Sequence, residues 1–159
     1  NIGLGLSDAS DEMIEEAGKK ASVHEWIMSL PNGYETEIKQ GKRDISDGEK
    51  QRIGLARLFL HDSPVMILDE PINGLDPIGI REMRDLFVNL VKTDGMTLLI
   101  SSHILTEVEH IADIIGVIVN GTIIREVPMA KVKAEYPSGL EDYFMDIMTG
   151  RKEDNENTY

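Results

Sequence analysis

Two short apolar runs, each ending in polar residues, set the strongest limit on how this chain can fold. Residues 65–68 (VMIL) lead into Asp69 and Glu70, and residues 97–100 (TLLI) lead into Ser-Ser-His. Between the runs, apolar side chains recur at helical spacing at Ile80, Met83, Phe87, Leu90 and Val91. A strand, a helix and a second strand in this order predict a β-α-β unit with buried, parallel strands. We therefore expect an α/β fold with functional groups at the carboxyl ends of its strands.

The residues before this unit carry helix signals and no strand signal. Ser10, followed by two acids, predicts the start of one helix. Ser22 with Glu25, and Ser46 with Glu49, have the spacing of capping boxes that begin two more helices. The composition therefore changes near the start of the first strand, from helices to alternating strands and helices.

After the second strand we expect a helix, a hairpin whose turn is Asn120-Gly121, and a last amphipathic helix. The polar end of the chain has no periodicity and is expected to be disordered. These patterns divide the chain into four parts: a helical subdomain at 1–61, an α/β core at 62–127, C-terminal helices at 128–150 and a tail at 151–159.

Charge and composition exclude several classes of function. The chain has 29 acidic and 16 basic residues and a net charge of −13, which disfavours direct binding to nucleic acid. It has no cysteine, which excludes thiolate metal sites and cysteine nucleophiles. The longest uncharged apolar stretch, residues 114–124, is shorter than the roughly 20 residues that span a bilayer. The chain begins with Asn and not with Met, so we expect a fragment of a longer protein.

Asp69 and Glu70 are the first candidates for chemistry. Carboxylates at the exit of a parallel strand suit a site that binds Mg²⁺ through Asp69 and activates a water through Glu70 as general base. A strand followed by a solvated acidic turn explains the same letters, and the two interpretations have about even odds on this motif alone.

Three further elements are individually ambiguous. Ser46 and Gly48 begin a helix, where a hydroxyl and backbone N–H groups can bind an anion, although a capped helix alone gives the same pattern. His103 follows a strand and could donate a hydrogen bond to a phosphate, although a lone His is more often a surface residue, as we expect for His24, His61 and His110. Asp76 lies in NGLDP, which by itself indicates a turn.

Together these motifs resemble, in order, those of ATP-binding cassette (ABC) ATPases. Residues 45–57 (ISDGEKQRIGLAR) resemble the signature motif and its helix, VMILDEP the Walker B strand, NGLDP the D-loop, and His103 stands where the switch histidine does. The resemblance covers residues 1 to about 149. Residues 1–38 look like the helical subdomain of exporters, whereas the second part is similar to ATPase subunits of bacterial peptide-immunity and bacitracin-type transporters.

The resemblance implies an incomplete P-loop NTPase fold with a helical subdomain and part of a mainly parallel sheet. It implies an ATPase, converting ATP and water to ADP and phosphate, that uses Mg²⁺ and works as a head-to-tail dimer. Ser46, Gly48 and Glu49 would contact the ATP of the opposite subunit, and Asp76 would cross the interface. Asp69, as metal ligand, and the catalytic residues Glu70 and His103 would serve the subunit's own ATP. The implied partners are a second ATPase subunit and a transmembrane transporter domain, at the cytoplasmic face of the cell membrane, with peptides or antimicrobials as possible substrates.

The sequence departs from the family at two important places. It contains no G-x-x-x-x-G-K-[ST] motif, so a P-loop half would have to come from elsewhere and the chain alone should not bind ATP tightly. In the family fold the P-loop strand lies between the strand ending at Ser101 and the one beginning near Ile114, so we expect a gap in the sheet. Either another chain supplies the missing strand or the fragment packs abnormally. Asp47 replaces a usual Gly and adds negative charge beside the expected phosphate.

Two other functions fit part of the pattern. An ABC-type ATPase of DNA repair or chromosome maintenance shares the motifs, but it would need coiled-coil arms and a basic surface, which this acidic sequence lacks. A non-catalytic interaction fragment would carry the motifs without using them, and it differs from an ATPase in whether it supports nucleotide binding.

Overall fold

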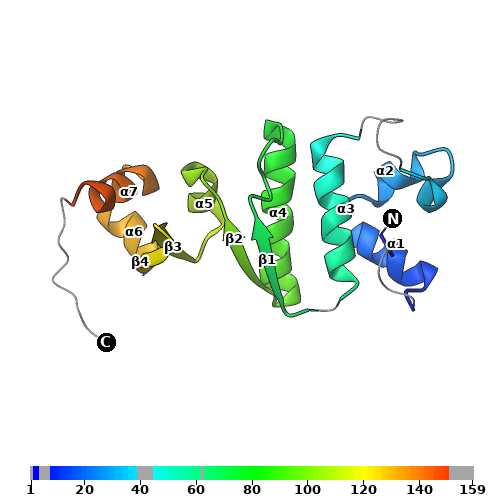
Figure 1. The fold of residues 1–159 in the computed structure, drawn as a ribbon, viewed down its shortest axis with the longest axis horizontal. Coiled ribbons are helices and arrows are strands. Elements are labelled where there is room, and N and C mark those ends of the chain that lie inside the picture. Colours follow the sequence, from blue (N-terminus) through cyan, green and yellow to red (C-terminus); the bar gives the residue numbers. More distant parts are fainter. Residues whose placement is uncertain (1, 4–7, 39–44, 62, 151–159) are drawn as a thin grey trace. The chain divides into compact units, whose positions relative to one another are not determined.

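The computed structural model describes residues 2–3, 8–38, 45–61 and 63–150, and Figure 1 shows the arrangement of the elements within them. The chain divides into two compact units, Asn1–Ser101 and Ser102–Tyr159. Mixed helices and strands confirm the α/β class, with a parallel strand pair in the first unit. Among the described residues, no helix is long and apolar enough to cross a membrane. The tail that we expected to be disordered lies outside these residues.

The first unit begins with helical elements that follow the predicted caps, with one correction. They are α1 (Asp11–Lys20), α2 (His24–Met28), the 3₁₀ helix η1 (Gly33–Glu35) and α3 (Asp47–Phe59). Ser10 caps α1 by accepting a hydrogen bond from the Met13 amide, as predicted. The capping box predicted at Ser22 is wrong, because Val23 precedes α2 and makes no side-chain cap.

The backbone at Ser22 explains this error. Ser22 has a φ of 55° and closes the end of α1. Its amide donates to the Lys19 carbonyl at 3.0 Å, and the Val23 amide donates to the Gly18 carbonyl at 2.9 Å. This pair of bonds is a Schellman motif, in which Ser22 takes the left-handed position that ends a helix. The backbone of Ser22 therefore ends α1, and its side chain does not cap α2.

The predicted β-α-β unit is confirmed. It consists of β1 (Val65–Asp69), α4 (Pro77–Asp94) and β2 (Thr97–Ser101), and the two strands pair in parallel with Asp69 opposite Ser101. Helix α4 buries Met83, Leu86, Phe87 and Leu90. Gly95 follows it in the left-handed conformation that commonly ends helices.

The strands are covered on one face only, which corrects the expectation that they are buried. Met66 and Leu68 are buried, whereas Ile67 is 73% exposed and Leu99 is 62% exposed. Side chains alternate between the faces of a strand, so Ile67 and its partner Leu99 lie on the same side of the pair. Within the described residues nothing covers that apolar face.

The second unit is a hairpin with helices. Its elements are α5 (Leu105–Ile111), β3 (Ile114–Val119), β4 (Thr122–Pro128), α6 (Met129–Glu135) and α7 (Leu140–Thr149). Strands β3 and β4 are antiparallel, and both turn residues, Asn120 and Gly121, have the positive φ that a tight hairpin needs. A small core of Ile115, Met129, Val132 and Leu140 holds the unit together. Ile118 and Ile123, on the other face of the hairpin, are 65% and 62% exposed.

Candidate functional site

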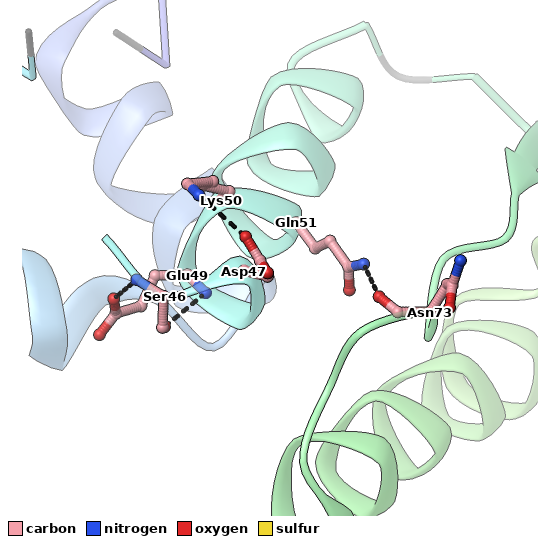
Figure 2. A network of polar contacts seen from close by, with 6 residues as sticks. All are labelled: Ser46, Asp47, Glu49, Lys50, Gln51 and Asn73. Atoms are coloured by element: carbon pink, nitrogen blue, oxygen red, sulfur yellow. Dashed lines mark hydrogen bonds and ion pairs between the residues drawn. The ribbon is translucent and has the colours of Figure 1, made fainter. Parts of the chain in front are cut away.

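The turn that begins α3 is organised by a reciprocal pair of hydrogen bonds, shown in Figure 2. Ser46 Oγ accepts from the Glu49 amide at 3.3 Å, and Glu49 Oε2 accepts from the Ser46 amide at 2.8 Å. The predicted capping box is therefore confirmed. Because Ser46 Oγ acts as an acceptor here, the hydrogen of its hydroxyl remains available for a ligand. The Glu49 carboxylate, in contrast, is directed at its own helix cap.

Asp47 and Gly48 follow at the start of the helix. Asp47 Oδ1 lies 2.8 Å from Lys50 Nζ, so the carboxylate that departs from the family pattern is paired with a cation one turn along. Both side chains are mostly exposed, which makes the pair weak. A methyl group added at Gly48 would meet only Leu75, at an ordinary 3.5 Å. Packing within the chain therefore does not require a glycine at this position.

Asp76 lies on the turn that begins α4. Asp76 Oδ1 accepts from the Gly79 amide at 2.7 Å and caps this helix, and Pro77 is its first residue, where a missing N–H is tolerated. The starts of α3 and α4 line the same cavity of about 660 Å³, which includes Ser46, Asp47, Gly48, Glu49, Gly74, Leu75 and Asp76. The structure thus brings four predicted site residues together, and all four come from one unit.

The end of β1 forms a second group. Ser101 Oγ donates to Asp69 Oδ1 at 2.5 Å and accepts from the Glu70 amide at 3.0 Å. Glu70 has a φ of 47°, a left-handed conformation that costs a residue with a side chain roughly 1–2 kcal/mol. Such strain is concentrated at functional sites, where surrounding bonds hold it in place. Sequence reasoning did not single out Ser101, although its pairing with Asp69 follows from two parallel strands that end at the same edge.

His103 belongs to the second unit, where its side chain is exposed. The other histidines were predicted to be surface residues. His61 and His110 are exposed, and His110 Nδ1 lies 2.5 Å from the Thr106 carbonyl. His24 is partly buried, with Nδ1 3.0 Å from the Tyr34 hydroxyl, so its side chain has a structural contact within the helical part.

Two residues of α3 that sequence reasoning missed reach the segment around Asp76. Gln51 Nε2 donates to the Asn73 carbonyl at 3.1 Å, as Figure 2 shows. Arg52, a buried charged residue, forms an ion pair with Glu82 on α4. Both partners are far away in the sequence, so no local pattern could have revealed either contact.

The Asp69 carboxylate at the end of β1 suits a magnesium ion whose other ligands come from a bound nucleotide. Within the described residues, no group of three or more acidic or histidine side chains could hold a metal. Mg²⁺ commonly uses one or two carboxylates and takes its remaining ligands from phosphates and water. Asp69 is exposed and is held in place by the Ser101 hydroxyl, so it is suited to supply one such carboxylate ligand.

Comparison with known proteins finds relatives among the ATP-binding proteins of transporters. The ABC transporter family matches residues 6–73. The bacitracin transport ATP-binding protein BcrA of Bacillus licheniformis is 41% identical over 140 residues, which are 88% of this chain and 41% of BcrA. The chain belongs to the ABC transporter ATP-binding family. The lantibiotic transport ATP-binding protein SrtF of Streptococcus pyogenes is 52% identical to this ABC ATPase chain over 88 residues, 55% of the chain and 38% of SrtF.

Fused and separate relatives both occur among the matches. The glutathione/L-cysteine transport system ATP-binding/permease protein CydD of Bacillus subtilis is 46% identical over 121 residues, which are 76% of the ABC chain and 20% of CydD. A bacterial Atm1-family ABC exporter with ATP bound superposes with a TM-score of 0.72 at 25% identity, over 99% of the chain and 26% of the exporter. The predicted similarity to both exporters and bacitracin-type subunits is confirmed. The chain spans only about two fifths of BcrA.

Proposed function

We propose that this ABC chain supplies one half of a composite ATP site to an ATPase dimer that powers transport. The observation that carries the proposal is the cavity lined jointly by Ser46, Gly48 and Asp76. In a head-to-tail dimer this surface closes on ATP held by the P-loop of the opposite subunit. Peptide antimicrobials are the proposed cargo, because BcrA and SrtF are named for bacitracin and lantibiotic transport.

The start of α3 is suited to binding a terminal phosphate. Ser46 keeps a hydroxyl hydrogen to donate, the amides of the first turn carry the positive end of the helix dipole, and Gly48 lets a ligand approach the backbone. Asp47 opposes an anion, and its pairing with Lys50 reduces that repulsion. Glu49 contributes by fixing the cap, since its carboxylate accepts the Ser46 amide.

Asp69, Glu70 and His103 serve the nucleotide of their own subunit in this proposal. Glu70 takes a proton from water while the water oxygen attacks the γ-phosphorus, the bond to the bridging oxygen breaks and ADP leaves. His103 donates a hydrogen bond to the γ-phosphate. Mg²⁺, held partly by Asp69, would neutralise charge on the phosphate oxygens. The contribution of Ser101 is to fix Asp69 and the Glu70 backbone at the strand end.

The uncovered strand face supports the proposal that a second polypeptide carries the P-loop half. Val65, Ile67 and Leu99 are each at least half exposed on the β1–β2 pair. A two-stranded parallel sheet is rarely stable without further strands or helices, so we propose that the partner adds a strand and covers this face. The assembled ATPase would bind a transmembrane domain at the cytoplasmic face of the membrane.

Titration of the chain with Mg-ATP, followed by sedimentation with a partner, tests the proposal. The chain alone should show no micromolar affinity for Mg-ATP in calorimetry. With BcrA from B. licheniformis and a non-hydrolysable ATP analogue plus Mg²⁺, it should form a complex that Mg-ADP does not support. Micromolar binding by the chain alone, or association that is indifferent to the nucleotide, would contradict the proposed division of the site.

A further inference from the structure

Arg52 stands out because it is charged and only 8% exposed. A guanidinium cannot lose its proton in a protein, so burial requires a counter-charge and hydrogen-bond acceptors. Both are present. One terminal nitrogen pairs with Glu82 Oε2 on α4, and the other donates to the Ser22 carbonyl at 3.3 Å. Arg52 thus joins three segments: the turn after α1, helix α3 and helix α4.

The neighbouring residue makes a second connection to the same region. Gln51 Nε2 donates to the Asn73 carbonyl, which precedes Asp76, whereas Glu82 follows Asp76 on α4. Consecutive residues of α3 therefore hold the segment that carries Asp76 on both sides. The two bonds originate one turn beyond the cap formed by Ser46, and Arg52 and Glu82 also line the cavity.

We infer that Gln51 and Arg52 are positioning residues that make the Ser46 turn and the Asp76 turn move as one body. The inference rests on the proposed function for its purpose, which is to present both turns to one nucleotide with fixed spacing. A single tether would allow the Asp76 segment to rotate about it. Two tethers on opposite sides of Asp76 remove that freedom, and burial of the Arg52 guanidinium strengthens one of them.

The exposure of Glu82 makes the inference testable without opening a cavity in the core, although Arg52 then loses its counter-charge. Its side chain is 57% exposed, against 10% for that of Arg52. Truncation of Glu82 therefore leaves no buried cavity, whereas truncation of Arg52 would. Asp85, which is also exposed and lies on α4, provides a matched acid whose removal should not affect the two turns.

Amide hydrogen exchange of the intact chain should compare wild type, Glu82→Ala and Asp85→Ala. In Glu82→Ala the capped amides of Gly79 and Glu49, one on each turn, should both exchange about tenfold faster, as expected for loss of a hydrogen bond between charged groups. Amides in the β1–β2 pairing should be unchanged, and Asp85→Ala should match wild type. Unchanged exchange at both turns, or equal acceleration throughout the first unit, would overturn the inference, because the latter indicates general destabilisation.

Association with BcrA and the ATP analogue gives the functional measurement. Glu82→Ala should raise the analogue concentration needed for half-maximal association by about tenfold and leave the maximal extent unchanged, since the turns remain present but are no longer pre-positioned. If wild type does not associate, the proposed function fails while the exchange experiment still decides the positioning role. If wild type associates and Glu82→Ala behaves like it in both measurements, the positioning role is wrong and the proposed function stands.

Discussion

Ser46 has two separable tasks, and substitutions at this position can distinguish them. Its oxygen caps α3 through the Glu49 amide, and its hydroxyl hydrogen is proposed to bind phosphate. Ser46→Ala removes both, whereas Ser46→Asp retains an acceptor and loses the donor. Asp caps helices about as well as Ser, and it favours the positive end of the helix dipole.

The expected loss of stability follows from the hydrogen bond of the helix cap. Ser46→Ala should destabilise the chain by about 1 kcal/mol, the usual cost of a lost N-cap, and lower the melting temperature by about 2–4 °C for a chain of this size. Ser46→Asp should remain within about 0.5 kcal/mol of wild type. Both variants should lose nucleotide-dependent association with BcrA. Urea and thermal unfolding followed by circular dichroism measure the first effect, and sedimentation measures the second.

Either of two results would exclude one of the roles assigned to Ser46. If Ser46→Asp is as unstable as Ser46→Ala, the cap does not depend on the acceptor oxygen. If Ser46→Asp associates normally in the presence of the ATP analogue, the hydroxyl hydrogen has no role in binding phosphate.

Other residues give simpler tests. Phe87→Ala should destabilise the chain by about 3–5 kcal/mol in urea unfolding, since Phe87 is 2% exposed, whereas Ile67→Ala at a 73% exposed position should change stability by only about 0.5 kcal/mol. Gly48→Ala should unfold like wild type, because the added methyl group has room, yet abolish association with the ATP analogue; normal association would remove the case for close approach at this residue. Burial, and secondarily the charge of Glu15, raises the pKa of Tyr34 above 10.0, so the folded state favours the neutral phenol. That contribution to stability is complete below pH 10.0 and is lost as the pH rises through the folded-state pKa of Tyr34. Glu15→Gln should lower the pKa of Tyr34 in a phenolate absorbance titration. An unchanged titration would contradict the assigned effect of the Glu15 charge.

Local signals explain the parts of the fold that the sequence predicted. The capping box at Ser46, the Asn120-Gly121 turn and the spacing of apolar residues in α4 each depend on neighbours within a few positions, and all three are present. Ser22 shows the limit of this reasoning. Ser22-x-x-Glu25 has the residue pattern of a capping box, but the end of α1 requires a left-handed residue at Ser22. The Schellman hydrogen bonds therefore form there in place of a cap.

Contacts between distant residues explain the parts that could not be predicted. The pair of Arg52 and Glu82 joins residues on different helices, and its formation depends on how α3 and α4 meet. Apolar composition likewise indicated strands for residues 65–68 and 97–100, but the burial that we expected from it holds for one face only, because coverage depends on distant segments. The candidate motifs were recognised as a set, because each alone had an ordinary structural explanation.

The uncovered face of β1 and β2 has a consequence for how the chain behaves in solution. An apolar strand pair with open edges can template pairing between copies. The net charge of −13 opposes such encounters through mutual repulsion, and the range of this repulsion shrinks as ionic strength increases. Hydrophobic attraction between the same faces is not screened by salt, and sulfate strengthens it. The colloidal state of the chain therefore depends on its electrolyte, with dilute buffer favouring dispersed molecules and concentrated sulfate favouring clusters.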